Sequence, residues 1–342
     1  MLQQYFGPLR LLQSNTILII IALYSGFFAT AILIPKSYAQ LPKDRGKEFS
    51  VGGNVAMGKP TGTGLVFITI FLFICLLITP MNNSQLAVLL LTWLVMLTGF
   101  LDDKSETPWG ELKKGVLDLL LSVATAFVLY YMRDGLFWLP FVTGTINCHP
   151  AIYIVVTTVI LWISINTTNC SDGIDGLSGT LVLIALIFLG ALFYFVQGHI
   201  EISEYLLVPH LKDGAQWAII VFALCGTLMG YLWHNAFPSK CLMGDAGSRA
   251  LGYLLGVCVM VSGNPFLILM TSSVLLVNGG AGLVKVALLR FFKIKIFSNV
   301  RFPLHDHMKK NLQWSPTQIL LKFVIIQILV SLLMLGIIFK VR

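Results

Sequence analysis

Residues 151–196 read AIYIVVTTVILWISIN, then TTNCSDGID, then GLSGTLVLIALIFLGALFYFV, so two apolar runs flank one short polar segment. The runs cover 151–166 and 176–196, close to the ~20 residues that an α-helix needs to cross a bilayer. Neither run alternates between apolar and polar residues, as the strands of a membrane barrel do. The stretch therefore predicts two membrane-spanning helices joined by a polar turn at one face of the membrane.

The same pattern recurs along the 342-residue chain, which is 57% hydrophobic and 11% charged. Soluble domains carry about 25% charged residues, so this composition indicates a protein that lies in lipid. Because lipid accepts only helices or closed barrels, we expect an all-α polytopic membrane protein, a single integral-membrane domain over residues 1–342. Of its ten expected spans, the eighth is short: 16–34, 62–80, 85–101, 115–131, 151–166, 176–196, 215–232, 249–262, 266–289 and 317–339.

Basic residues are distributed unequally between the two sides of this predicted bundle. Of the 23 Lys and Arg residues, 17 lie in one set of connecting segments, counted one or two residues into the span ends, and only five lie on the other side. The positive-inside rule makes the basic segments cytoplasmic and places both termini outside. This topology accounts for the net charge of +8 without a nucleic acid partner. The basic segments are 35–61, 102–114, 167–175, 233–248 and 290–316.

Two other features exclude common alternatives. Arg10 precedes the first apolar run, but no small-residue cleavage site follows it, so we expect this span to be retained rather than removed as a signal peptide. The six cysteines have no paired spacing, so neither a zinc site nor a disulfide framework is predicted.

The polar segment 166–177 carries the strongest functional signal. Asn166, Asn169, Asp172 and Asp175 recur at every third position, and the first two share a face if the helix continues. The glycines that follow each aspartate are expected to end the helix and to let the backbone approach a ligand. Four amide and carboxylate side chains between two spans are costly in a membrane protein, so they predict a functional site.

Acidic residues in two other basic segments are candidates for the same site. Asp102 and Asp103 are adjacent at the end of the third span, and their charged form needs a cation or water nearby, although a solvated helix end is an equal alternative. Asp245 lies between glycines where the eighth span begins. It is either a plain helix cap or a ligand that holds Mg²⁺ against a phosphate. Lys114, in the segment after Asp103, lies within reach.

Two further segments contribute cations and histidines. Lys59 and Thr61 place an ammonium group and a hydroxyl at the mouth of the second span. His305 and His307 flank Asp306 among several basic residues, and the two histidines share a side only if the backbone is extended. A zinc site is conceivable there, but the surrounding Arg and Lys favour a phosphate-binding cluster.

These motifs resemble those of the polyprenyl-phosphate N-acetylhexosamine-1-phosphate transferase superfamily, and within it most closely the phospho-N-acetylmuramoyl-pentapeptide transferase family. The resemblance covers essentially the whole chain. Three departures concern Asp306, which replaces a middle histidine, Leu242, which replaces an aromatic residue expected to stack on uracil, and Lys114, a stand-in for a lysine that does not align. The matching motifs are Asp102-Asp103, Asn166 to Leu177, Gly244 to Ser248, Pro303 to His307 and the ending Lys340 to Arg342.

The resemblance implies a bacterial plasma-membrane enzyme with a cytoplasmic active site and a need for Mg²⁺. Its reaction would move phospho-MurNAc-pentapeptide from UDP-MurNAc-pentapeptide onto undecaprenyl phosphate, giving lipid I and UMP. The implied metal ligand is Asp245, and the implied catalytic residues are Asp102, Asp103, His305 and His307. The implied substrate-binding residues are Lys59, Thr61, Lys114, Asn166, Asn169, Asp172, Asp175, Asn235 and Asp306.

Some questions stay open at this level. A sister transferase that uses UDP-GlcNAc is one alternative, and an ion-coupled transporter is another. Transporters place carboxylates near the midplane, often in inverted repeats, and this chain shows neither pattern. A covalent phospho-aspartate and a direct displacement are both compatible with the sequence, as are a monomer and a homodimer.

Overall fold

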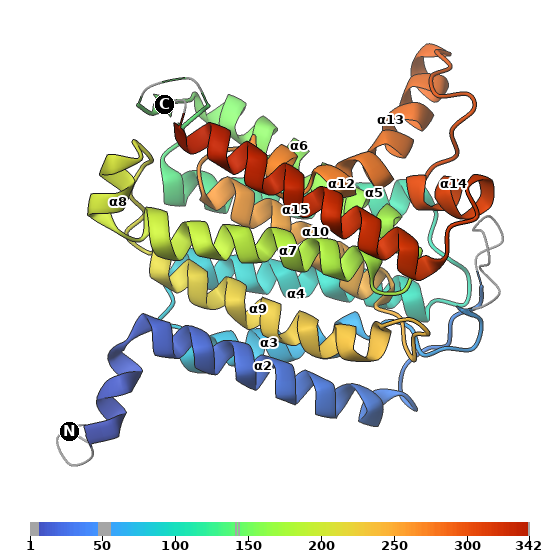
Figure 1. The fold of residues 1–342 in the computed structure, drawn as a ribbon, viewed down its shortest axis with the longest axis horizontal. Coiled ribbons are helices and arrows are strands. Elements are labelled where there is room, and N and C mark those ends of the chain that lie inside the picture. Colours follow the sequence, from blue (N-terminus) through green and yellow to red (C-terminus); the bar gives the residue numbers. More distant parts are fainter. Residues whose placement is uncertain (1–6, 47–55, 141, 143, 341–342) are drawn as a thin grey trace.

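The computed structural model describes residues 7–46, 56–140, 142 and 144–340, and over them the chain is almost entirely helical (Figure 1). The described strands are β1 (Leu136–Phe137) and β2 (Ile146–Asn147), which pair antiparallel. The predicted all-α class is confirmed. The helices are η1 (Gly7–Gln13), α2 (Asn15–Ser37), α3 (Gly64–Ile78), α4 (Asn83–Lys104), α5 (Glu111–Arg133), α6 (Pro150–Ser171), α7 (Leu177–Ala191), η3 (Leu192–Gln197), α8 (Ile200–Tyr205), α9 (Gly214–Asn235), α10 (Gly244–Val261), α11 (Leu267–Thr271), α12 (Ser273–Leu275), η4 (Leu276–Gly280), α13 (Ala281–Ala287), η5 (Leu288–Phe292), α14 (Leu304–Asn311) and α15 (Pro316–Lys340).

Each of the ten predicted spans overlaps helical structure, but the spans differ in kind. Within the described residues, eight helices are long and apolar enough to cross a membrane, and α3 is a shorter apolar helix of 15 residues. The predicted span 266–289 is not one regular helix. It is divided into α11, α12, η4, α13 and η5, and Gly279 lets η4 approach α6 so closely that a Cβ there would lie 2.4 Å from the Thr167 carbonyl oxygen.

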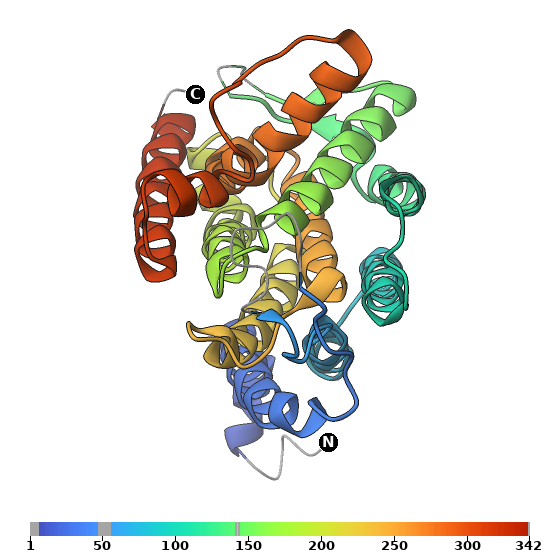
Figure 2. The ribbon, with the colours of Figure 1, turned by 90° about the vertical axis from the view of Figure 1, so that its right-hand side faces the viewer.

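Helix α10 lies in the middle of the bundle, which the end-on view shows (Figure 2). Every residue from Ala246 to Val261 is buried. Its neighbours approach it through glycines: a Cβ on Gly64 of α3 would lie 2.1 Å from the Gly247 nitrogen, and one on Gly252 would lie 2.5 Å from the Ser164 oxygen of α6. Small residues at such crossings let backbones come close in membrane bundles. Because other helices cover it, α10 needs no long apolar run, which explains why 249–262 is a weak span in the sequence.

The polar loops gather at one end of the bundle. In Figure 1, α14 and the turns that follow α4, α6 and α9 lie at the right-hand end, whereas α2 begins and α15 ends at the left-hand end. This arrangement agrees with an even number of crossings. It brings segments from distant parts of the sequence to one face.

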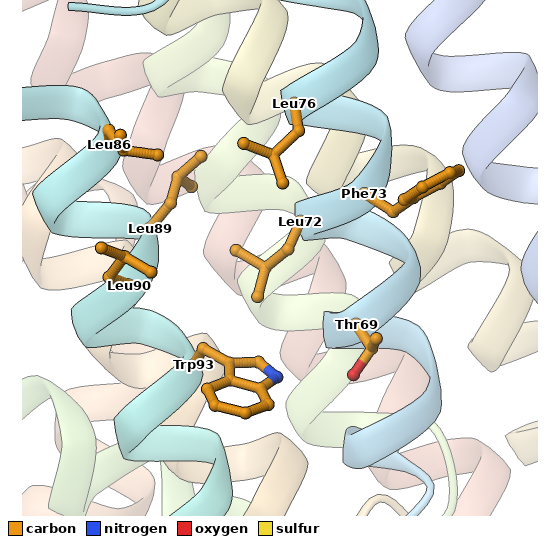
Figure 3. A pocket seen from close by; sticks show the side chains of 8 residues that line it. All are labelled: Thr69, Leu72, Phe73, Leu76, Leu86, Leu89, Leu90 and Trp93. Carbon is orange, nitrogen blue, oxygen red and sulfur yellow. The ribbon is translucent and has the colours of Figure 1, made fainter. Parts of the chain in front are cut away.

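A groove between α3 and α4 is apolar and faces outward (Figure 3). Its only polar side-chain atoms are the Thr69 hydroxyl and the Trp93 indole nitrogen. Trp93 lies ten residues before Asp103, which is ~15 Å along a helix, so the groove is separate from the polar end. The groove is therefore not part of the polar site. Its lining is Thr69, Leu72, Phe73, Leu76, Leu86, Leu89, Leu90 and Trp93.

Candidate active site

The first turn of α10 brings together side chains from three other helices. The Asp245 carboxylate accepts a hydrogen bond from Lys114 Nζ of α5 at 2.8 Å and one from Asn169 Nδ2 of α6 at 3.0 Å. Lys114 also forms an ion pair with Asp102 of α4. We call these residues, together with Asp103, the α10 cluster. The sequence predicted a role for each of them, and the fold places them in contact.

Asp103 caps α10 from outside the helix. Its two carboxylate oxygens accept the backbone N–H groups of Asp245 at 2.9 Å and Ala246 at 3.0 Å. A negative charge is favourable there because the N-terminus of a helix carries a partial positive charge. Gly244 permits this approach, since it has φ +66° and a Cβ there would lie 2.3 Å from Asp103 Oδ2. The cap that the sequence considered for Asp245 is thus supplied by Asp103, which leaves the Asp245 side chain facing the cluster.

Asp245 is held in its charged form. Burial by itself would raise its pKa, but the charge of Lys114 and the hydrogen bonds from Lys114 and Asn169 outweigh burial and lower the pKa to about 2. The carboxylate is therefore ionised at neutral pH. Lys114, a cation, already bridges Asp102 and Asp245. Because two carboxylates converge on this one ammonium group, the surroundings of Asp102 and Asp245 favour positive charge.

A second group forms around Asp175 at the turn before α7. Ser239 donates from its hydroxyl to Asp175 Oδ1 at 2.8 Å and from its backbone N–H to Oδ2 at 2.9 Å. Lys59 Nζ donates to the Ser239 hydroxyl at 2.9 Å and lies 3.9 Å from Asp175. Asn235, only 3% exposed, uses its side chain to hold the Gly176 N–H and the Cys241 carbonyl, both at 2.8 Å. Asn235 therefore shapes the turn that presents Asp175.

A third group forms around His305 in α14. Asn278 of η4 accepts the His305 backbone N–H at 2.9 Å, and its Oδ1 lies 3.1 Å from the ring Nδ1. The His305 ring also packs against Gly173, where a Cβ would lie 2.3 Å from Nε2. Asp306, 4% exposed, lies 3.9 Å from Arg301. Because 304–311 is helical, His307 does not share a side with His305, and its Nδ1 accepts the Arg301 N–H at 3.3 Å.

The segment 169–176 connects the three groups. Asn169 belongs to the α10 cluster, Gly173 contacts His305, and Asp175 contacts Lys59 and Ser239. Helix α6 ends at Ser171 and Gly176 has φ +76°, so the predicted helix break lies where the glycines indicated. For two predicted residues, the described part of the chain shows no side-chain contact with these charged groups. Asn166 donates to the Trp162 carbonyl of its own helix at 2.9 Å, and Thr61 is 7% exposed.

Sequence reasoning did not identify Ser239 or Asn278. Ser239 lies in the segment before the Gly244–Ser248 motif, and a serine in a loop carries no pattern of its own. Asn278 was the better signal, because it is a fully buried amide within an apolar run, where a polar side chain needs a partner.

The chemistry of the cluster suits a hard cation and phosphate oxygens. In the described part of the chain no three His, Cys, Asp or Glu side chains converge as a ligand set. One or two carboxylates with an amide nearby are what Mg²⁺ uses when substrate phosphates complete its coordination. Lys59, Lys114 and Arg301 supply positive charge around the same segment.

Comparison with known proteins agrees with this arrangement. Residues 85–263 match the family model described as glycosyl transferase family 4. The chain is 54% identical over 344 residues to a phospho-N-acetylmuramoyl-pentapeptide-transferase of Treponema pallidum, covering 100% of this chain and 95% of that protein. Enzymes with the same name from Campylobacter hominis and Campylobacter jejuni are 27% identical over 92% of this chain and 30% identical over 81%. The family match spans every helix of the α10 cluster, from α4 to α10.

Proposed function

The chain belongs to the phospho-N-acetylmuramoyl-pentapeptide transferases of glycosyl transferase family 4, and on that premise we propose how its polar end carries out the transfer. The reaction moves phospho-MurNAc-pentapeptide from UDP-MurNAc-pentapeptide to undecaprenyl phosphate, with lipid I and UMP as products. It is a step of peptidoglycan synthesis in a bacterial membrane, and the chain is a multi-pass protein of that membrane.

The observation that carries the proposal is the convergence on Asp245. Asp102, Lys114, Asn169 and Asp245 come from four helices and meet at the first turn of the central helix. In phosphoryl transfer the protein contributes mainly positioning and charge neutralisation. A cluster of fixed opposite charges on a rigid helix supplies both.

Mg²⁺ fits this cluster, and Asp245 would hold it, with Asp102 as the second nearby carboxylate. When bound, the ion neutralises the diphosphate oxygens of the UDP-sugar. Lys114 keeps Asp245 ionised and holds the carboxylates of Asp102 and Asp245 in place. Asp103 contributes indirectly, because it fixes the backbone of Asp245 through the cap.

The other two groups bind the remaining parts of the donor. Asp175, placed by Ser239 and Asn235, and Asp172 hold the nucleoside and its phosphates with Asn169. Lys59 and His305 supply positive charge and a hydrogen-bond donor for phosphate or sugar oxygens. Asp306, which lies 3.9 Å from Arg301, is proposed to orient that cation toward the substrate, and His307, Thr61 and Asn166 are proposed to shape the surroundings of the site.

We favour direct attack by the lipid phosphate over a covalent phospho-aspartate. A phosphate monoester has a second pKa of about 6, so it is mostly dianionic at neutral pH and needs no strong base. Both oxygens of Asp103 accept amide hydrogen bonds, and Asp102 is engaged by Lys114 and by the Trp109 N–H at 2.7 Å. Carboxylates bound in this way are poor nucleophiles. A phosphorylated Asp102 or Asp103 trapped on rapid quench would contradict this mechanism but not the family.

The polar end is proposed to face the cytoplasm, with both termini outside. The basic segments support this sidedness through the positive-inside rule. The soluble UDP-sugar is then met at the membrane surface, where the lipid phosphate also lies. A single domain over 1–342 and a homodimer stay predictions, and light scattering of the detergent-purified protein tests the second.

The deciding experiment is UMP release in detergent with undecaprenyl phosphate as acceptor. We expect release from UDP-MurNAc-pentapeptide and little from UDP-GlcNAc. Omitting Mg²⁺ should stop the reaction, and restoring it should recover the rate. Release from UDP-GlcNAc alone would assign the chain to the sister activity instead.

A further inference from the structure

A polar contact ladder joins α5 to α10 below the active site. Both helices begin at the polar end, and the contacting residues are spaced along one face of each, at intervals of four and seven on α5 and of four on α10. The ladder has three rungs, the first at 2.8 Å and the last at 2.9 Å: Lys114 with Asp245, Asp118 with Arg249, and Thr125 with Tyr253.

The middle rung is an ion pair deep in the bundle. Asp118 is 1% exposed and Arg249 is 2% exposed. Arg249 donates to the single oxygen Asp118 Oδ1 from Nε at 3.2 Å and also from Nη2. Its third nitrogen, Nη1, is buried and has no partner among the described residues. Neither residue was expected in a site, and Arg249 was counted with the basic residues of the inner surface.

Stability alone does not explain this pair. Removing two charges from water is costly, and apolar side chains of similar volume often hold helices together equally well or better. The pair also lies one helical turn from Lys114 and Asp245. Each of the four charged side chains therefore has an opposite charge next to it on its own helix and another across from it on the other helix. Because two nitrogens of Arg249 donate to the same oxygen of Asp118, this contact fixes the rotation and the axial position of α5 relative to α10.

The upper rung depends on that register. Lys114 lies near the start of α5, whose N-cap, Gly110, provides no side-chain cap. Several α5 side chains face away from the bundle, for example Leu112 at 82% exposed and Leu120 at 60% exposed. Without the middle rung, the first turns of α5 would be free to shift while α10 stays fixed by its glycine contacts.

We propose that Asp118 and Arg249 are positioning residues of the transferase, which hold Lys114 in register with Asp245. The proposal rests on the function proposed above, because it concerns the geometry of that site. It predicts an effect on the chemical step and little effect on substrate binding. Arg249 acts through Asp118 and α5, and neither residue needs to touch the substrate.

The test compares three variants of the full-length protein in detergent. Asp118→Leu/Arg249→Leu removes the pair without leaving an unpaired charge. Arg249→Lys keeps a cation on the rung. Thr125→Val/Tyr253→Phe removes the lower rung of the same two helices and is the matched control.

We expect the leucine double variant to fold, with a thermal midpoint close to that of the parent protein. Its kcat should fall by about tenfold or more, since a displacement of ~1 Å at a reacting centre can cost ~10²-fold. Its KM for the UDP-sugar and its UMP affinity by calorimetry should change little. Arg249→Lys should recover most of the rate, and the control should behave like the parent protein.

Hydrogen exchange supplies a readout that needs no substrate. Amides 111–118 should exchange faster in the leucine double variant and at the parent rate in the control. An unchanged kcat in the folded double variant, an equal fall in the control, or a double variant that does not fold would each overturn the proposal. An inactive parent protein would instead contradict the proposed function, and hydrogen exchange would then decide the register inference alone.

Discussion

Lys114 is the cation that pairs with two carboxylates of the α10 cluster. It contacts Asp102 and Asp245, while Asp103 accepts hydrogen bonds from backbone amides at the start of α10. Two carboxylates therefore share one ammonium group, which leaves an excess negative charge at a partly exposed position, 20% for the Asp245 side chain. This charge would favour a divalent cation whose remaining charge is balanced by substrate phosphates. The cluster therefore fits the proposed Mg²⁺ without a dedicated cage of protein ligands.

Replacing Asp245 tests this assignment directly. Asp245→Asn should leave the fold intact and lower kcat by about 10²-fold or more, because metal stabilisation of the transition state is worth several kcal/mol. The measurement is UMP release over a range of Mg²⁺ concentrations, with thermal unfolding as the control for folding. Near-normal turnover at ordinary Mg²⁺ would end the assignment.

Substitutions of Asp175 and Asp103 should distinguish an effect on binding of the UDP-sugar from an effect on the chemical step. Asp175→Asn weakens the contacts to Ser239 and Lys59 and should mainly raise KM for the UDP-sugar. Asp103→Asn removes the charge that fixes the start of α10 and should mainly lower kcat while UMP still binds. Loss of uniform binding affects KM, and loss of transition-state stabilisation affects kcat. The reverse pattern in steady-state kinetics would exchange the two roles.

The acid limb of the pH profile, where the rate falls at low pH, should come from protonation of the acceptor lipid phosphate. If the lipid phosphate ionises by itself, its second proton, with a pKa of about 6, is lost before attack, so the rate should fall as pH drops below about 6. The limb should persist in an Asp103→Asn variant that retains measurable activity. A limb that disappears in this variant would make Asp103 the base.

At the scale of elements, the helix break between α6 and α7 was predictable, and the contacts that Ser239 and Asn278 make in the candidate site were not. The break follows from local chemistry, since the glycines that follow Asp172 and Asp175 disfavour a continued helix and Gly176 adopts a positive φ that favours glycine. Whether His305 and His307 lie on the same side depended on whether 303–307 is helical or extended, which the sequence left open. Ser239 and Asn278 become meaningful only when the loop before α10 and the η4 turn are brought against Asp175 and His305.

The crossing of α3 over α10 should tolerate no side chain. Gly64→Ala places a Cβ 2.1 Å from the Gly247 backbone nitrogen, so α3 must move, at a cost of about 1–3 kcal/mol. Gly115→Ala on α5 is the matched control, because nothing lies within 4 Å of its Cβ. The control should be neutral or stabilising by up to about 1 kcal/mol, as expected for Gly to Ala in a helix. Thermal unfolding in detergent compares them, and equal midpoints would contradict the close crossing.

At the scale of the whole molecule, the distribution of basic residues predicted which loops lie together. Over the described residues, which exclude 47–55 of the first segment, those loops lie at one end of the bundle (Figure 1). The prediction counted Arg249 only with the basic residues of the inner segments, and its buried pairing was not foreseen because its partner Asp118 lies 131 positions away. Hydropathy likewise located the central helix only weakly, since protein and not lipid surrounds it.

The orientation of the protein in the membrane is tested by thiol labelling in sealed, right-side-out vesicles. A cysteine at the exposed Lys310 of α14 should resist an impermeant thiol reagent added outside and react once the vesicles are opened. A cysteine at Tyr205 of α8, which is 86% exposed at the opposite end, should react from outside. The six native cysteines are buried or half-buried, and the unmodified parent protein measures their background. Reaction of the position 310 cysteine from outside would invert the topology.

The cap that Asp103 places on α10 has a consequence for inhibitor resistance. One carboxylate of the α10 cluster holds the first turn of the central helix in place. A compound that makes its main contact with Asp103 could be evaded at that position only by a substitution that also loosens the scaffold. Escape mutations should therefore fall at residues that contact the compound outside the α10 cluster. Variants selected against it should keep Asp103 unchanged.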